Sequence, residues 1–158
     1  MAARRTQQRG RHAVVAGAPQ ERVISWSPEQ QVVTRTASGI HRQTYRETRA
    51  RACRLANALA GHGIAPGDRV ASFMWNNHRH LEMYQALPSM GAVLHTLNIR
   101  LSPRDLEYII GHAEDRVIVV DEDLLPLLEP LADRLPSVEL FVVCSARGGE
   151  QGKGGWKT

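Results

Sequence analysis

The sequence contains few of the residues that build covalent or metal-stabilised frameworks. Only two of its 158 residues are cysteines, and aromatic residues make up 5% of the chain. Cys53 and Cys144 lie on separate predicted elements, with no Cys-x-x-Cys pair and no neighbouring histidine at ligand spacing. This pattern indicates neither a disulfide framework nor a zinc site. We expect both residues to be ordinary buried or half-buried thiols.

Long apolar runs are also missing. The longest, at residues 117–120 and 140–144, are far shorter than the roughly 20 residues that cross a bilayer. The first eleven residues contain four arginines, but no apolar stretch long enough for a secretory signal follows them. With 42% apolar and 23% charged residues, the composition is that of a soluble globular protein. We therefore predict a cytoplasmic protein without a transmembrane segment.

Lysine is scarce, because arginine supplies all but two of the 20 basic residues. Residues 1–54 hold 11 arginines and only 3 acidic residues, whereas the rest of the chain is acidic on balance. Residues 1–22 have no helical or strand period, so we predict a disordered basic arm. Such an arm can bind a polyanion through counterion release. The simpler interpretation is surface solvation, with Arg46, Arg49, Arg51 and Arg54 on the outer face of one helix, and we expect no nucleic-acid partner.

Residues 23–144 are predicted to form one α/β domain in which helices and apolar strands alternate. Thr44 and Glu47 have the spacing of a capping box, and Ser102-Pro103-x-Asp105 is a second helix start. Gly61 or Gly63 is expected to close the first of these helices in a left-handed conformation. Strands are predicted at residues 31–36, 40–43, 69–74, 92–97, 116–120 and 139–143. Helices are predicted after Thr44 and Ser102 and at residues 78–90 and 123–135.

The strands after residue 68 are apolar runs without polar alternation, and helices separate them. This order favours a mostly parallel sheet with helices on both faces. Residues 145–158 contain five glycines and no period, and we predict a disordered tail there. The fold class is therefore α/β, a partial sheet with flanking helices.

No catalytic, cofactor-binding or metal-binding residue can be assigned from spacing. The tail segment Gly148 to Lys153 resembles a phosphate-binding loop only superficially, because it is one residue short and Gly154 follows the lysine. His78 and His80 are two residues apart and do not share a helix face, so we interpret them as part of a polar loop entering a helix. His95, on a predicted central strand, and His112 are expected to be structural.

Six phrases in residues 32–143 are similar to the N-terminal region of AMP-forming acyl-CoA synthetases of the medium- and long-chain fatty acid branch. They are TYRE at 44–47, RLANAL at 54–59, GIAPGDRVA at 63–71, WNNHRHLE at 75–82, MGAVLHTLN at 90–98 and RLSP at 100–103. Their order and spacing match, over about 70% of the chain. The resemblance implies a fragment of the large N-terminal α/β domain of an adenylate-forming enzyme.

The resemblance also implies a parent reaction, in which a fatty carboxylate attacks ATP and CoA then displaces AMP from the acyl-adenylate. ATP, Mg²⁺ and CoA are thus cofactors of the parent family, but none is expected to bind this chain. The family's Ser/Thr/Gly-rich phosphate loop ending in Pro-Lys-Gly does not occur here. We expect a catalytically inactive product of a truncated or frame-shifted reading. The alternatives are an interaction module, as a homodimer or paired with an intact synthetase, and a polyanion-binding protein.

Overall fold

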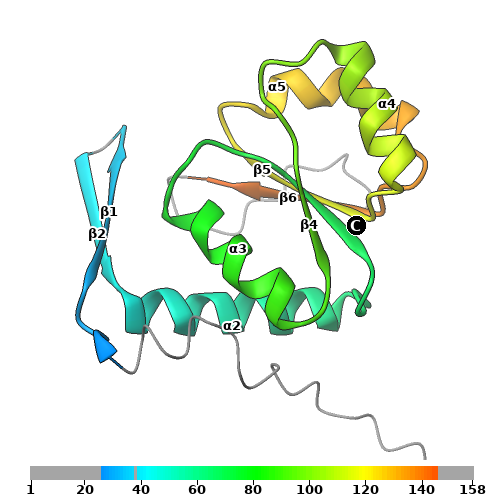
Figure 1. Ribbon diagram of the computed structural model, residues 1–158. Coiled ribbons are helices and arrows are strands. Elements are labelled where there is room, and N and C mark those ends of the chain that lie inside the picture. The colour runs from blue at the N-terminus through cyan, green and yellow to red at the C-terminus, as the bar shows by residue number, and fades with distance from the viewer. Residues whose placement is uncertain (1–25, 38, 146–158) are drawn as a thin grey trace, which may run out of the picture.

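The computed structural model describes residues 26–37 and 39–145. The predicted basic arm at 1–22 and residues 146–158 of the predicted tail lie outside these described residues. An antiparallel hairpin, β1 (Gln31–Thr36) and β2 (Gly39–Thr44), leads directly into the helix α2 (Tyr45–Gly61). Figure 1 shows the hairpin standing apart from the main sheet.

The main sheet has four parallel strands in the order β4-β3-β5-β6. Along the chain it comprises β3 (Arg69–Phe73), α3 (His78–Ser89), β4 (Val93–Thr96), α4 (Pro103–Ala113), β5 (Val117–Asp121), α5 (Leu125–Leu128), the 3₁₀ helix η1 (Glu129–Arg134) and β6 (Leu140–Cys144). The predicted parallel α/β sheet is confirmed. β4 lies at the edge of this sheet, however, so the prediction of a central strand for His95 is wrong. Strand order depends on the crossovers, which a local pattern does not report.

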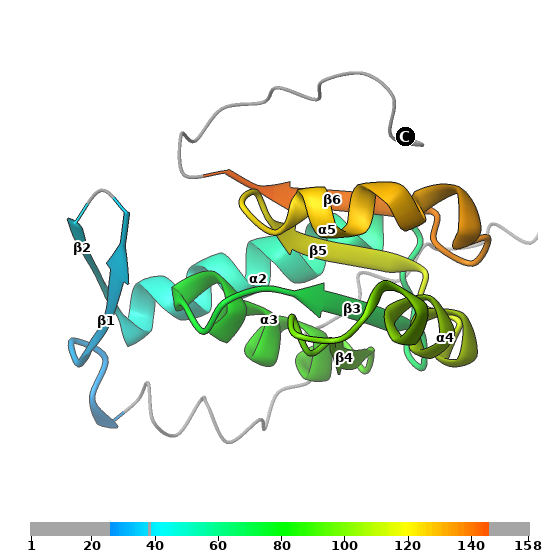
Figure 2. The ribbon, with the colours of Figure 1, turned by 90° about the horizontal axis from the view of Figure 1, so that it is seen from above.

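Helices cover both faces of the sheet, as Figures 1 and 2 show. One core lies between α2, α3 and the sheet, and it includes Leu59, Met83 and Val70. The other lies on the opposite face under α4, α5 and η1, and it includes Phe73 and Ile110. Residues of β3 therefore point to both cores, which explains why Val70, Ala71 and Phe73 are all buried in this strand.

The two helix starts predicted from the sequence are confirmed in atomic detail. The Thr44 hydroxyl accepts a hydrogen bond from the backbone N–H of Glu47, and the Glu47 carboxylate accepts one from the backbone N–H of Thr44. At the start of α4 the Ser102 hydroxyl accepts from the N–H of Asp105 and donates to the Asp105 carboxylate. After α2, Gly63 takes the left-handed conformation with φ +85°. The hydrogen bonds at Thr44 and Ser102 satisfy backbone donors that a helix start leaves without partners.

The predicted helix at 123–135 is wrong in type for most of its length. The four-residue helix α5 passes at Glu129 into the 3₁₀ helix η1, which ends at Arg134. Pro126 and Pro130 cause this, because each lacks a backbone N–H and restricts the residue before it. The apolar side chains still reach the core, since Leu128 and Leu131 are fully buried.

An ion-pair cluster closes the amino end of the sheet. The Arg116 guanidinium, just before β5, donates to the carboxylates of Asp68 before β3 and Glu139 before β6. It also donates to the carbonyl oxygen of Gly63, which follows α2. The hydrogen bonds from Arg116 hold the pKa of the Glu139 carboxyl below its usual range. The Arg116 side chain thus connects the starts of three strands with the end of one helix.

Candidate functional site

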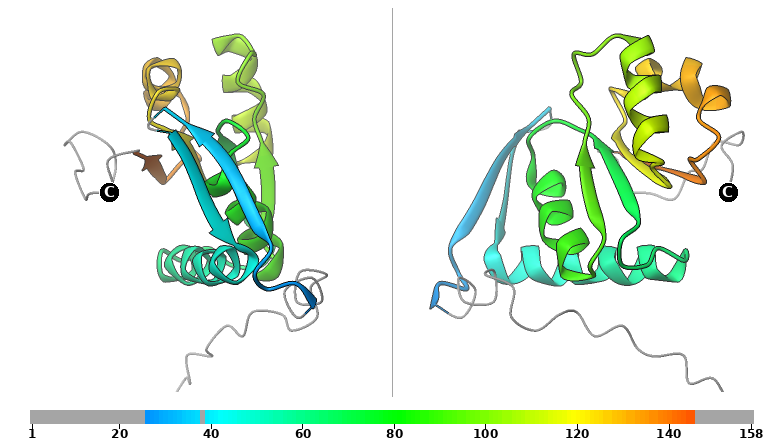
Figure 3. Two further views of the ribbon diagram at one scale, coloured as in Figure 1. Left: turned by 90° about the vertical axis from the view of Figure 1, so that its left-hand side faces the viewer. Right: turned by 45° about the vertical axis from the view of Figure 1, so that its right-hand side comes forward.

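The opposite end of the sheet, where the strands finish, contains a topological switch point. From β3 the chain crosses through α3, on one face, to β4. From the neighbouring strand β5 it crosses through α5 and η1, on the other face, to β6. Figure 3 shows the two connections leaving on opposite sides. In open α/β sheets, ligands bind in the crevice that such diverging connections create beyond the carboxyl ends of the strands.

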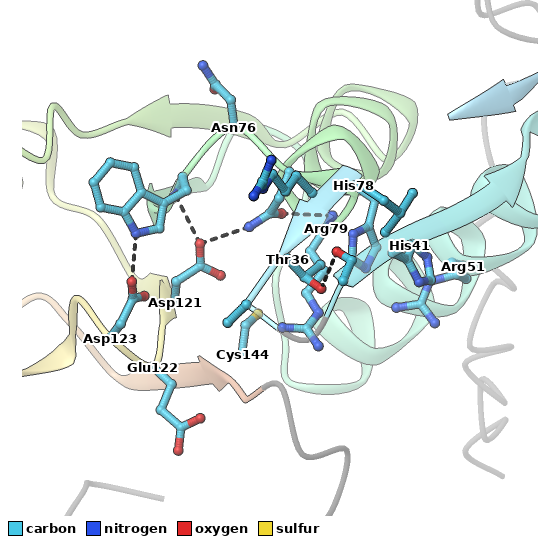
Figure 4. Close-up of a pocket in the computed structure, with 16 residues that line it drawn as sticks. Thr36, His41, Arg51, Asn76, His78, Arg79, Asp121, Glu122, Asp123 and Cys144 are labelled. Carbon is cyan, nitrogen blue, oxygen red and sulfur yellow. Dashed lines mark hydrogen bonds between the residues drawn. The ribbon is translucent and has the colours of Figure 1, made fainter. Parts of the chain in front are cut away.

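A cavity of about 600 Å³ lies at this position, between the strand ends and the hairpin. Its walls come from the hairpin, from Arg51 on α2, from the loop after β3 with the start of α3, and from the ends of β5 and β6. Figure 4 shows polar and charged side chains from these segments around the cavity. The site is therefore assembled from segments as far apart in sequence as Arg35 and Cys144.

Asp121, the last residue of β5, organises the wall at the switch point. Its carboxylate accepts hydrogen bonds from the Trp75 backbone N–H and the Asn77 side-chain amide, both at 2.9 Å. Asn77 in turn caps α3, because its side-chain oxygen accepts from the N–H groups of Arg79 and His80. Burial raises the pKa of the Asp121 carboxyl, and the hydrogen bond from Trp75 partly offsets the rise. Asp121 thus joins β5 to the start of α3.

Two stacked imidazoles connect the hairpin to α3. The rings of His41 on β2 and His78 on α3 stack with their centroids 3.9 Å apart. His78 is only 7% exposed, and its Nδ1 is buried without a hydrogen-bond partner among the described residues. Burial, followed by the neighbouring His41, lowers the pKa of His78 to about 4. The ring is therefore uncharged at neutral pH.

A buried polar network lies beside this stack. Gln43 of β2 donates through its side-chain amide to the Thr48 hydroxyl at 2.9 Å and to the Glu82 carboxylate at 3.2 Å. Glu82, on α3, also accepts from Arg51 of α2 at 2.6 Å. No apolar side chain of the described hairpin residues is fully buried. The hairpin is therefore attached to the domain mainly by polar contacts.

The structure changes the interpretation of the two neighbouring histidines. Neither belongs to a solvated loop, since both lie on α3 and His80 is buried as well. The Ser72 hydroxyl on β3 and the His80 ring nitrogen Nε2 are 2.9 Å apart, and burial lowers the pKa of His80. The side chains of His78 and His80 contact different neighbours, as their helical spacing predicted. Their burial was not predicted, because the surrounding sequence is polar.

The other predicted residues lie away from the cavity, with one exception. The His95 ring nitrogen Nδ1 lies 2.7 Å from a carboxylate oxygen of the fully buried Asp115, and His112 stacks on the exposed ring of Tyr108. That both are structural stays a prediction. Cys53 is half-buried as predicted. Cys144 is half-buried too, but it lines the cavity, where burial raises the pKa of its thiol to about 11. It is a neutral thiol at pH 7.

The described part of the chain has no group of three or more His, Cys, Asp or Glu side chains placed to hold a metal ion. The Gly148 to Lys153 segment lies outside the described residues. None of the helices in residues 26–37 and 39–145 is both long and apolar enough to span a membrane.

Sequence reasoning assigned no site residue, so it missed the polar groups at the strand ends. Asn77, Arg79 and Asp121 each follow or end a predicted strand, and all three line the cavity. The switch-point rule, applied to the predicted strand ends, is the signal that would have found them. The strand order needed for that rule is not visible in the sequence.

Comparison with known proteins gives consistent results. The model of the family described as AMP-binding enzyme matches residues 14–154. The chain is 47% identical over 131 residues to a long-chain-fatty-acid–CoA ligase of Thermus thermophilus, covering 82% of this chain and 24% of the relative. It is 39% identical over 134 residues to a medium-chain-fatty-acid–CoA ligase of Ectopseudomonas oleovorans, covering 84% and 24%.

A solved structure of a Mycobacterium tuberculosis fatty acyl CoA synthetase has the same fold in this region. It superposes with a TM-score of 0.72 at 26% identity, over 79% of this chain and 25% of that protein. The chain thus spans about a quarter of the length of the proteins it matches.

Proposed function

Because the chain belongs to the AMP-binding enzyme family, we propose that it forms the N-terminal α/β segment of a fatty-acid–CoA ligase. The observation that carries this proposal is the 47% and 39% identity to two fatty-acid–CoA ligases, each over more than four fifths of the chain. The parallel sheet with helices on both faces supports it, since a fatty acyl CoA synthetase has the same fold in this region.

The proposed parent reaction has two steps: the fatty carboxylate attacks ATP to give an acyl-adenylate, and the CoA thiol then displaces AMP. We propose that the 158 residues alone do not catalyse either step. The reason lies in the sequence, which contains no Ser/Thr/Gly-rich loop ending in Pro-Lys-Gly to hold the phosphates. Enzymes of this kind depend on groups that position and stabilise the developing charge, and positioning alone contributes about 7–11 kcal/mol.

A segment exchange tests the proposal. Residues 31–145 would replace the aligned segment of the Thermus thermophilus long-chain-fatty-acid–CoA ligase, and acyl-CoA formation would be measured with octanoate, palmitate and benzoate. We expect a folded chimera that ligates at least one fatty acid and discriminates against benzoate. A chimera that folds, as judged by circular dichroism, but ligates no fatty acid would contradict the assignment.

The matched control is the 158-residue chain itself, incubated with ATP, Mg²⁺, CoA and the same acids. We expect no acid-dependent AMP release from it. Turnover by the chain alone would overturn the proposal that it is inactive, while leaving its family unchanged.

A second candidate function is association with another chain, either a second copy or an intact ligase. The edges of the sheet favour it, because β4 and β6 each pair on one side only within the described residues. Val93 on β4 and Val143 on β6 are 48% and 38% exposed. Unpaired strand edges with exposed apolar residues readily accept another strand. Light scattering after size exclusion, alone and mixed with a full-length ligase, is expected to show a complex, and a monomer in both runs would refute this function.

A further inference from the structure

The cavity at the carboxyl ends of the sheet has properties that the ligase assignment does not use. Its volume of about 600 Å³ falls within the range of about 300–1,000 Å³ that is typical of sites for small molecules. It also lies where open α/β sheets bind their ligands. The charges on its walls indicate what kind of molecule fits.

One set of lining side chains is cationic and lacks acidic partners. Arg35, on the hairpin, forms no ion pair or side-chain hydrogen bond within the described residues. The guanidinium of Arg79 donates to the backbone carbonyl of Ser145 at 2.8 Å, and it has no carboxylate partner in the same part of the chain. A guanidinium group binds a carboxylate through two parallel hydrogen bonds. These two side chains can therefore receive an acid.

A second set of lining side chains is acidic and is bonded only to neutral donors. Asp121 accepts from Trp75 and Asn77, and Asp123 accepts from the Trp75 indole at 2.9 Å. Glu122 accepts from the Ser145 hydroxyl at 2.8 Å. None of these carboxylates has a cationic partner among residues 26–37 and 39–145, and each has further acceptor capacity. They suit a ligand that donates hydrogen bonds.

We propose that this cavity binds a small carboxylic acid that also carries a hydroxyl or ammonium donor. Its carboxylate lies against Arg35 and Arg79, and its donor group faces Asp121 to Asp123. The carboxylate of the ligand then faces the cationic part of the wall, and its donor group faces the acidic part, so no like charges are brought together. The uncharged ring of His78 also lines the cavity. The inference does not depend on ligase activity.

Binding has a structural consequence that gives a second measurement. Arg35 comes from β1 and Arg79 from α3, so a ligand that contacts both joins the hairpin to the domain. The hairpin is otherwise held by the Gln43 network and the stacked imidazoles. A two-stranded hairpin is marginally stable by itself. Ligand binding is therefore expected to slow amide hydrogen exchange in β1 and β2.

The test uses the full 158-residue chain, without ATP or CoA, and three matched probes. 3-Hydroxybutyrate carries both groups, butyrate carries only the carboxylate, and 1,3-butanediol carries only hydroxyls. Binding is followed by two-dimensional NMR and calorimetry. We expect saturable binding of 3-hydroxybutyrate, binding of butyrate weaker by roughly tenfold, and no binding of the diol.

Two variants test the cationic side chains. Arg35→Gln and Arg79→Gln are each expected to weaken 3-hydroxybutyrate binding by roughly tenfold or more. Arg42→Gln is the control, because Arg42 lies on the same hairpin but does not line the cavity. If Arg79→Gln fails to fold, the proposal is still tested by the affinity of Arg35→Gln and by amide hydrogen exchange in β1 and β2 of the unmodified protein.

Three results would overturn the proposal. They are no saturable binding of 3-hydroxybutyrate, equal binding of butyrate, and unchanged affinity in Arg35→Gln. Because the assay contains no ATP or CoA, each of these results is independent of the segment exchange that tests the ligase assignment.

Discussion

Removing Glu82 should loosen the hairpin and destabilise the whole domain. Glu82 is 5% exposed, and its carboxylate accepts from the buried Gln43 amide and from Arg51. Losing a hydrogen bond to a charged group costs about 1.5–3 kcal/mol when the partner is buried. The Arg51 side chain is 42% exposed, so water replaces part of that bond and we assign it about 0.5–1 kcal/mol. For Glu82→Ala we therefore expect a loss of about 2–3 kcal/mol in the free energy of unfolding.

The measurement is urea unfolding followed by far-ultraviolet circular dichroism, with amide hydrogen exchange of β1 and β2 as the local readout. Glu82→Gln keeps an acceptor in place and should lose only about 1 kcal/mol. Glu107→Ala is the matched control, because Glu107 pairs with the half-exposed Arg134 at 3.2 Å and should contribute less than about 0.5 kcal/mol. A Glu82→Ala protein as stable as the control, with unchanged hairpin exchange, would refute the reasoning.

Three further predictions concern single residues. Gly91→Ala should lose about 1–2 kcal/mol of stability in urea, because φ is +79° and the new Cβ would lie 3.0 Å from Pro66 Cβ. Gly61→Ala is the control, since Gly61 is in an open helical position and the substitution should gain up to about 1 kcal/mol. Ser102→Ala should lose about 1 kcal/mol by removing the cap of α4, and Ser102→Thr, which keeps a hydroxyl to accept from the Asp105 N–H and donate to its carboxylate, should restore most of it in the same assay. The free energy of unfolding should fall as pH drops from about 6.5 towards 4, because His78 is buried uncharged and the unfolded chain binds the proton more readily. His78→Asn should flatten that dependence when urea unfolding is measured across this pH range.

Local signals in the sequence were enough to predict most of the elements. The capping box at Thr44 and the Ser102 start fixed two helices, because the bonds involved join residues three positions apart. Apolar runs located the strands to within a residue or two. The helix expected at 123–135 failed because its apolar spacing was read without enough weight on Pro126 and Pro130.

The candidate site depends on contacts that no local pattern contains. The Trp75 and Asn77 bonds to Asp121 join residues 46 and 44 positions apart, and the hairpin contributes the far wall. Their proximity follows from the order of the strands, which the sequence does not state. The burial of His78 was missed for the same reason, since the neighbouring residues on α3 are polar and the covering ring of His41 belongs to another element.

The two ends of the sheet differ in their freedom to change during evolution. At the amino end, Arg116 holds Asp68 and Glu139 together, so replacing any one of the three affects contacts around three strands at once. At the carboxyl end, Arg35 forms no ion pair or side-chain hydrogen bond among the described residues, so a substitution there would leave the strands of the main sheet in register. Single substitutions at the carboxyl end can therefore change what the cavity binds, while the ion pairs at the amino end keep the strands of the sheet in place.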